Sequence, residues 1–128
     1  MVSIRAIHHV SLLVSDTGRA LTFYRDLLGL EVDGARPEMD YPGAWLRMDN
    51  AQIHLLELPD VLRGTERPEH GGRDRHVALS VTDMDALVIV LEAAGVVYTL
   101  SRSGRRALFC RDPDGNAIEL VEVITGST

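Results

Sequence analysis

Cysteine and large aromatic side chains are scarce in this chain of 128 residues, which contains one cysteine, one tryptophan and two phenylalanines. A single cysteine, Cys110, excludes both an intrachain disulfide and a cysteine-rich metal site. Positive charge is also scarce, because the chain has 13 Lys and Arg against 19 Asp and Glu, which gives a net charge of −6. This balance argues against nucleic acid and against an anionic membrane surface as partners.

The chain also lacks a long hydrophobic run. Its longest apolar stretch, "ALVIVL" from Ala86 to Leu91, is closed by Glu92 and is far too short to span a bilayer. The opening "MVSIRAIHHV" has no apolar segment of the signal-peptide type. We therefore expect a cytoplasmic protein whose length suits one compact domain, with no membrane as partner.

What the chain does contain is an internal repeat. The stretch "HHVSLLVSDTGRALTFYRDLLGL", from His8, aligns with "RHVALSVTDMDALVIVLEAAGV", from Arg75. The ends of the two halves also agree, since "IHLLEL" at 53–58 matches "IELVEV" at 118–123. Such similarity indicates two copies of one unit. The matched pairs include His9 with His76, Asp16 with Asp83, Gly29 with Gly95, His54 with Glu119, and Glu57 with Glu122.

Each copy predicts a strand, a helix and then three strands, so the expected fold class is α+β, built from βαβββ modules. An Asp at the end of the first strand can cap the helix that follows, and a Gly closes each helix. We expect the first module at 1–58, a linker rich in Pro, Gly and charge at 59–74, and the second module at 75–128. The expected strands are 9–15, 30–36, 43–49, 52–58, 76–82, 96–101, 105–111 and 117–123, and the expected helices are 17–28 and 84–94.

Two adjacent histidines, His8 and His9, open the first strand, and alternation along a strand predicts that they point to opposite faces. His9 falls on a small, polar face with Ser11, and His76 takes its place in the second copy. His8 falls with the helix-facing residues and is expected at the strand edge, turned to solvent. The polar face is therefore the candidate functional face.

Four potential metal ligands take repeat-equivalent places: His9 and His76 on the first strands, His54 and Glu119 on the last strands. If the two copies pack about a pseudo-twofold axis, these four side chains converge. Three imidazole nitrogens and a carboxylate suit Zn, Ni, Co, Mn or Fe(II), and they disfavour Ca²⁺. A single strand histidine is more often a hydrogen-bonded core or edge residue, so the prediction depends on all four together.

Other side chains are expected near this face. The stretch "EHGGRD", which contains His70, predicts a loop that could act as a lid, whereas Glu57 and Glu122 fall on the face opposite the ligands and are excluded. Arginines that could contact an anionic substrate, with a solvated surface position as the alternative, are Arg47, Arg73, Arg75, Arg105 and Arg106. Residues that could line an apolar pocket or simply pack in strands are Tyr41, Trp45 and Phe109.

These stretches, together with "FYRDLLGL" and "FCRDPDGNAIELVE", resemble the vicinal oxygen chelate superfamily. That group includes glyoxalase I, methylmalonyl-CoA epimerase, extradiol dioxygenases and the fosfomycin and bleomycin resistance proteins. The resemblance implies two βαβββ modules forming a cup-shaped mixed sheet with helices outside and a divalent metal inside, commonly in a homodimer. By motif position it also implies the ligands His9, His54, His76 and Glu119.

The activity that the resemblance implies is that of a glyoxalase I-like lyase or isomerase. Such an enzyme acts on a small oxygenated metabolite through a metal-stabilised enolate or oxyanion, with Glu119 as both ligand and candidate base. His54 matches neither the Glu usual at its position in glyoxalase I-like enzymes nor the Gln usual in the epimerases. Two alternatives therefore stay open: a metal-independent drug-binding protein of the bleomycin-resistance type, and an Fe(II) ring-cleaving dioxygenase.

Overall fold

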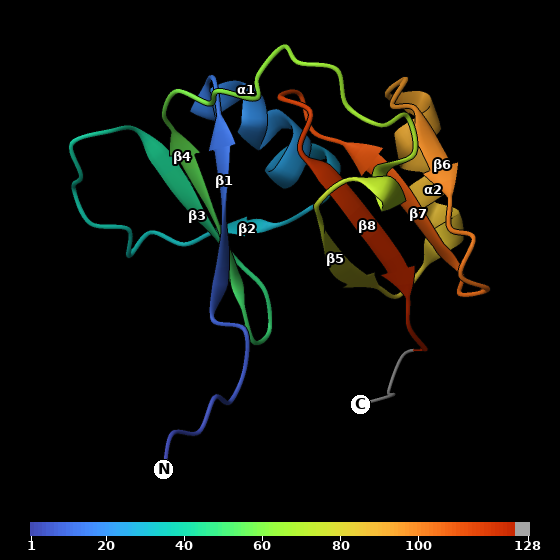
Figure 1. Ribbon diagram of the computed structural model, residues 1–128, viewed down its shortest axis with the longest axis horizontal. Coiled ribbons are helices and arrows are strands. Elements are labelled where there is room, and N and C mark those ends of the chain that lie inside the picture. Colours follow the sequence, from blue (N-terminus) through green and yellow to red (C-terminus); the bar gives the residue numbers. More distant parts are fainter. Residues whose placement is uncertain (125–128) are drawn as a thin grey trace. The chain divides into compact units, whose positions relative to one another are not determined.

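The computed structural model describes residues 1–124, and the chain forms two compact units, the first ending at Val61 and the second beginning at Leu62. Each unit is a four-stranded mixed sheet with few helices, so the expected α+β class and the βαβββ order of each half are confirmed (Figure 1). The last part of the expected second module, 125–128, lies outside the described residues. Within 1–124 no helix is long and apolar enough to cross a membrane.

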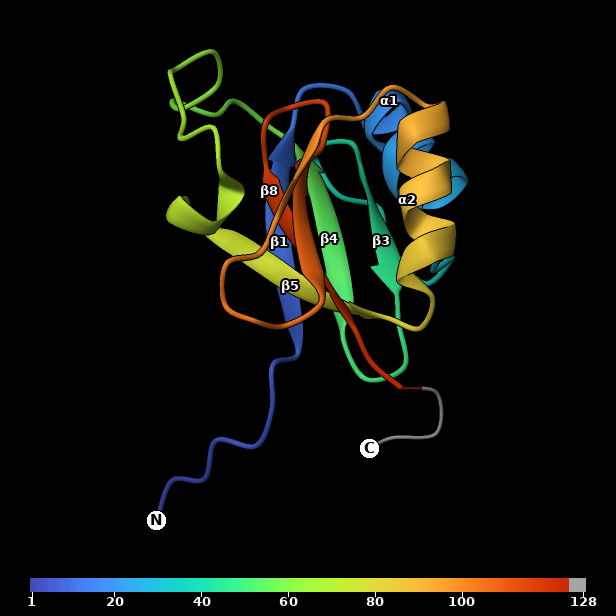
Figure 2. The same cartoon turned by 90° about the vertical axis from the view of Figure 1, so that its right-hand side faces the viewer.

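The sheet of the first unit has the strand order β1-β4-β3-β2. β1 pairs with β4 in parallel, as Figure 2 shows, and the remaining pairs are antiparallel. The parallel pair places the first and last strands of the unit next to each other, although the helix and two strands separate them in sequence. The elements are β1 (His9–Val14), α1 (Thr17–Leu21), the π-helix η1 (Thr22–Leu27), β2 (Glu31–Val32), β3 (Gly43–Arg47) and β4 (Gln52–Glu57).

Two details of the first unit differ from the sequence expectation. The helix expected at 17–28 begins as an α-helix, capped by the Asp16 side chain, and then widens into η1. Phe23 and Tyr24 are neighbours in η1 and are both buried, so the wider turn accompanies an apolar face that includes two consecutive aromatic rings. The strand expected at 30–36 is reduced to β2, because Gly34 and Pro37 disfavour further ladder pairing.

The second unit repeats this topology with the strand order β5-β8-β7-β6, and β5 is parallel to β8. Residues 62–74 belong to this compact unit, and Asp74 near their end forms ion pairs with Arg67 at 2.7 Å and Arg111 at 2.8 Å. The pair with Arg111 ties the segment to β7 (Ala107–Arg111). The elements are η2 (Gly71–Arg73, a 3-10 helix), β5 (His76–Val81), α2 (Met84–Ala93), β6 (Tyr98–Leu100), β7 (Ala107–Arg111) and β8 (Ala117–Glu122).

Strand register confirms the division of each sheet into an apolar and a polar face. On one face of the first sheet, Val10 lies opposite Ile53, which is fully buried. On the other face, Ser11 lies opposite His54, and the equivalent pair in the second unit is Ala78 with Glu119. The two residues expected to be equivalent, His54 and Glu119, therefore occupy the same place in the two units.

Glu57 and Glu122, the carboxylates excluded from the site, serve the helices instead. Glu57 Oε1 accepts a hydrogen bond of 2.8 Å from the backbone N–H of Thr17, at the start of α1. Glu122 Oε2 accepts one of 2.9 Å from the backbone N–H of Met84, at the start of α2. A carboxylate at a helix N-terminus satisfies an otherwise unpaired donor and complements the helix dipole. Each last strand thus holds the helix of its own unit.

Candidate functional site

The first unit brings His9 and His54 into contact. Their rings stack with centroids 4.0 Å apart and an interplanar angle of 15°. Trp45, the residue opposite His54 on β3, stacks on the ring of His54 with centroids 4.4 Å apart and an angle of 8°. Only 9% of His54 is exposed. Three rings from three adjacent strands therefore form one stack on the polar face.

A chain of hydrogen bonds sets the tautomer of His54. Gln52 Nε2 donates to Asp33 Oδ2 at 2.9 Å, and because a carboxylate oxygen accepts, this contact orients the Gln52 amide. Gln52 Oε1 then lies 2.8 Å from His54 Nε2, which must be the donor. The lone pair of neutral His54 is consequently on Nδ1. Sequence reasoning missed Asp33 and Gln52 as site residues, although the spacing of Gln52, two positions before His54 on one strand face, was visible.

The surroundings of His54 also favour its neutral form. Burial lowers the pKa of His54 below its usual value, and positive charge at His9, His8 and Arg36 lowers this pKa further. Metals bind the neutral imidazole rather than the imidazolium ion. Burial and tautomer together leave His54 with an available lone pair.

His8 and His9 do not point to opposite faces, so this expectation was wrong. β1 begins at His9, so the strand alternation that would separate the two side chains does not yet apply to His8. Their Nδ1 atoms are 2.8 Å apart, a hydrogen bond in which one ring donates to the other. When His9 is the donor, its Nε2 keeps the lone pair. His8 is exposed, as expected, but it is a direct neighbour of the candidate ligand.

The second unit brings His76 and Glu119 together. His76 Nε2 lies 3.2 Å from Glu119 Oε1. The other ring nitrogen, Nδ1, lies 2.9 Å from the backbone carbonyl oxygen of Asp74. A carbonyl oxygen only accepts, so Nδ1 carries a proton, and in neutral His76 the lone pair on Nε2 faces the carboxylate. Two acceptors at this distance require a proton or a cation between them.

Glu119 is a buried carboxylate whose negative charge is offset only weakly by other residues. Its side chain is 4% exposed, and its second oxygen, Oε2, lies 3.5 Å from Arg105 Nη2. Arg105 is 62% exposed, so solvent screens that ion pair and it contributes little. A desolvated carboxylate is costly unless charge or hydrogen bonds offset it. The surroundings of Glu119 are therefore suited to a cation.

Several other candidates from the sequence have structural partners. Arg47 pairs with Glu31 at 3.1 Å, and Arg106 pairs with Glu122 at 3.0 Å.

Burial, and then the charge of Asp112, raise the pKa of the Cys110 thiol to about 12, so this residue supplies no thiolate ligand. Among residues 1–124 no group of three or more His, Cys, Asp or Glu side chains is gathered as a metal-binding cluster. Each unit instead brings two candidate ligands together, His9 with His54 in the first and His76 with Glu119 in the second.

Comparison with known proteins gives a family and a set of relatives. The family model of the Glyoxalase/Bleomycin resistance protein/Dioxygenase superfamily matches residues 6–120. A protein named YaeR from Escherichia coli (strain K12) is 33% identical, over 95% of this chain and 99% of its own length. The lactoylglutathione lyase of Haemophilus influenzae is 30% identical, over 91% of this chain and 91% of its own length.

Solved structures share the fold. A mutant of the fosfomycin resistance protein FosX from Listeria monocytogenes, in complex with Mn(II) and 1S,2S-dihydroxypropylphosphonic acid, aligns with a TM-score of 0.75. The alignment covers 96% of this chain and 95% of that chain, at 18% sequence identity. At this identity the similarity is one of fold.

Proposed function

Because the chain belongs to the Glyoxalase/Bleomycin resistance protein/Dioxygenase superfamily, we propose that it is a metal-dependent vicinal-oxygen-chelate enzyme. Its reaction would be of the glyoxalase-like lyase or isomerase type, on a small oxygenated metabolite. The observation that carries the proposal is the contact of His76 with Glu119, in which Nε2 and a buried carboxylate oxygen face each other at 3.2 Å. The relationship to a lactoylglutathione lyase supports the reaction type.

The donor chemistry of the two pairs fits a divalent metal ion. In the proposed set, His54 offers Nδ1, His76 offers Nε2 and Glu119 offers Oε1, while His9 offers Nε2 when Nδ1 donates to His8. Imidazole nitrogens with one carboxylate suit Zn, Ni, Co, Mn or Fe(II). We propose that both pairs act together, supplied by one chain or by two chains of a homodimer.

In the proposed reaction Glu119 has two tasks. A bound metal ion would polarise the chelated substrate oxygens as a Lewis acid and make a neighbouring C–H group more acidic. Glu119 then takes the proton from that carbon, since its carboxylate is the candidate base on this face. Oε1 of Glu119 faces His76 Nε2 and would bind the metal, which leaves Oε2, 3.5 Å from Arg105 Nη2, to accept the proton. Burial of Glu119 keeps water away from the proton-transfer step.

Metal analysis of protein purified without a histidine tag tests this proposal. We expect stoichiometric metal that a chelator removes and that added metal restores, and we expect its loss in His76→Ala and in His9→Ala. The matched control is His70→Ala, which removes an imidazole outside the proposed set. Metal that remains in His76→Ala, or metal-free protein that cannot be loaded, would contradict the proposal. Turnover is then tested with hemithioacetals, acyl-CoA thioesters and catechols, and bound Fe(II) with catechol cleavage would favour the dioxygenase alternative.

One observation favours a second candidate function, a binding protein without turnover. The stack of His9, His54 and Trp45 presents planar rings on the polar face, and planar ligands bind to such surfaces. A drug-binding protein would retain its ligand after metal removal and after Glu119→Gln, whereas the enzyme would lose its activity in both cases. Ligand binding measured with and without chelator separates the two functions.

A further inference from the structure

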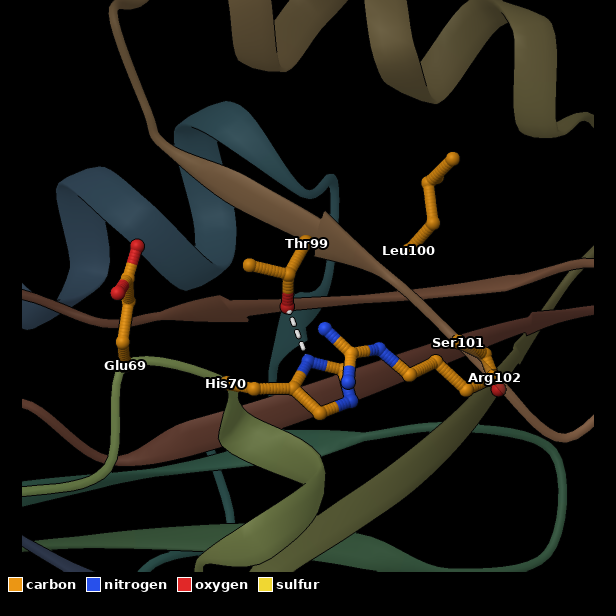
Figure 3. A pocket seen from close by; sticks show the side chains of 6 residues that line it. All are labelled: Glu69, His70, Thr99, Leu100, Ser101 and Arg102. Atoms are coloured by element: carbon orange, nitrogen blue, oxygen red, sulfur yellow. Dashed lines mark hydrogen bonds between the residues drawn. The ribbon is translucent and has the colours of Figure 1, made fainter.

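A cavity lies within the second unit. It has a volume of about 520 Å³, within the range of small-molecule pockets. The segment before η2 forms one side, and the end of β6, an edge strand, forms the other (Figure 3). The lining residues are Glu69, His70, Thr99, Leu100, Ser101 and Arg102.

This cavity opens on the same sheet face as Glu119. Thr99 lies directly opposite Phe109, and Phe109 lies directly opposite Glu119, so the three side chains share one face. The His70 ring contacts Phe109 with centroids 4.9 Å apart, and the His76 ring contacts Phe109 from its own position at 5.0 Å. One aromatic ring thus separates the cavity from the His76–Glu119 pair.

The wall formed by His70 is fixed in place. His70 Nδ1 and Thr99 Oγ1 form a hydrogen bond of 2.7 Å, drawn as a dashed line in Figure 3. A Cβ atom on Gly72 would lie 2.8 Å from His70 Nε2, and one on Gly71 would lie 3.2 Å from the Cβ of Phe109. Two consecutive glycines therefore allow this segment to lie against the sheet. Asp74, with its two arginine partners, anchors the end of the segment.

Arg102 supplies an uncommitted positive charge to the cavity. Its side chain lines the cavity together with His70 (Figure 3), and it forms no hydrogen bond or ion pair with any residue of the described chain. Glu69 also lines the cavity without a partner among residues 1–124. The arginines of this unit that do pair with carboxylates are Arg63, Arg67, Arg105, Arg106 and Arg111.

We propose that this cavity binds the carboxylate end of an elongated substrate, with Arg102 as the binding group and Glu69 as a residue that disfavours dianions. A guanidinium group binds a planar carboxylate through two parallel hydrogen bonds. Glu69 repels a second negative charge, so a carboxylate binds in preference to a phosphonate or phosphate. The proposal rests on the proposed function of the Glu119 face, because it names the substrate class of that same site.

Sheet geometry gives the length of such a substrate. Glu119 and Thr99 are separated by two strand spacings, or about 10 Å. The substrate class is therefore an oxygenated acid whose chelating oxygens and carboxylate are about 10 Å apart.

Titration of metal-free, ¹⁵N-labelled protein with butyrate, in the presence of a chelator, tests the subsite alone. The amide signals of residues 99–102 are expected to shift and saturate with butyrate, but not with the neutral isostere butyramide. Arg102→Gln is expected to weaken butyrate binding about tenfold, because it removes a charge-assisted pair. Arg5→Gln, which removes the same charge outside this unit, is the matched control. Glu69→Gln is expected to strengthen binding of butylphosphonate several-fold.

Equal shifts with butyrate and butyramide, or unchanged butyrate affinity in Arg102→Gln, would overturn the subsite. Because no metal is present, this result is independent of the metal analysis that tests the proposed function. In metal-loaded protein, 2-hydroxy dicarboxylates of increasing length are expected to bind most tightly when their ends are about 10 Å apart. The same optimum in Arg102→Gln would overturn the assignment of Arg102.

Discussion

His76 and Glu119 face each other directly: Nε2 lies 3.2 Å from Oε1, while Nδ1 donates to the carbonyl oxygen of Asp74. We expect Glu119→Gln to leave the metal-free protein as stable as the wild type or slightly more stable, because an amide can donate to the Nε2 lone pair and removes a buried charge. The same variant is expected to lose metal affinity by at least about tenfold, since it removes an anionic ligand. Thermal unfolding of metal-free protein and metal titration measure the two effects. A clear fall in stability together with unchanged metal affinity would contradict this view of the pair.

Glu57 and Glu122 are expected to behave in the opposite way. Each accepts a hydrogen bond from the first turn of a helix, and removing such a capping carboxylate costs about 1 kcal/mol. Glu57→Ala and Glu122→Ala should therefore lower the free energy of unfolding by about this amount and leave metal affinity unchanged. Urea unfolding and metal titration measure the two quantities. Loss of metal in either variant would show that these residues act at the candidate site.

The chain Asp33–Gln52–His54 is expected to control which ring nitrogen of His54 carries the proton. Gln52→Leu removes the acceptor for Nε2–H, so His54 should become a mixture of tautomers and metal affinity should fall about tenfold to a hundredfold. Long-range ¹H–¹⁵N correlation spectra of metal-free protein report the tautomer directly. Combining Asp33→Asn with Gln52→Glu exchanges donor and acceptor between the two positions, because the new amide can donate to the new carboxylate. This double variant should restore one tautomer, and an unchanged tautomer in Gln52→Leu would refute the role of the chain.

Gly72 is expected to matter for the position of His70. A Cβ on Gly72 would approach His70 Nε2 to 2.8 Å and Phe109 Cζ to 3.2 Å, so Gly72→Ala should displace the His70 ring from Thr99. We expect a loss of about 1 kcal/mol in stability and weaker butyrate binding. Gly34→Ala is the control, because a Cβ there meets nothing within 4 Å. Equal butyrate affinity in the two variants would mean that the His70 wall is unimportant.

The lowered pKa of Asp74 predicts that the protein loses stability as the pH falls. Burial acts to raise its pKa, but hydrogen bonds from Arg67 and Arg111 outweigh burial and hold the pKa at about 2, below the ordinary 3.8. A carboxyl whose pKa is lower in the folded state stabilises the protein above the unfolded-state pKa. That contribution is lost as pH falls from about 4 toward 2. Urea unfolding of wild type and Asp74→Asn should therefore differ at about pH 5 and converge at about pH 2. A constant difference across this range would contradict the assignment.

The sequence predicts the elements and strand faces well, because both depend on local patterns. Alternation along each strand gives the shared face of His54 and Ser11, and the repeat gives Glu119 as the equivalent of His54. The tautomers of the site histidines depend on individual hydrogen bonds that no local sequence pattern predicts. Asp33 follows β2 and reaches Gln52 on β4, a pairing that the bend of the chain after β2 determines. The His8–His9 contact was missed because strand alternation was extended to His8, which precedes the strand that begins at His9.

The candidate ligand and the helix-binding carboxylate are three residues apart on each last strand: His54 and Glu57 in one copy, Glu119 and Glu122 in the other. An odd spacing puts them on opposite faces of the sheet. The same strand therefore presents a candidate ligand on one face and binds the helix on the other. A substitution at the ligand position therefore leaves the hydrogen bond between the last strand and the helix in place. Each copy can therefore carry an imidazole or a carboxylate at the ligand position, as His54 and Glu119 show, and keep the contact with its helix. Such an arrangement permits functional diversity. The superfamily description accordingly includes glyoxalases, dioxygenases and a bleomycin resistance protein.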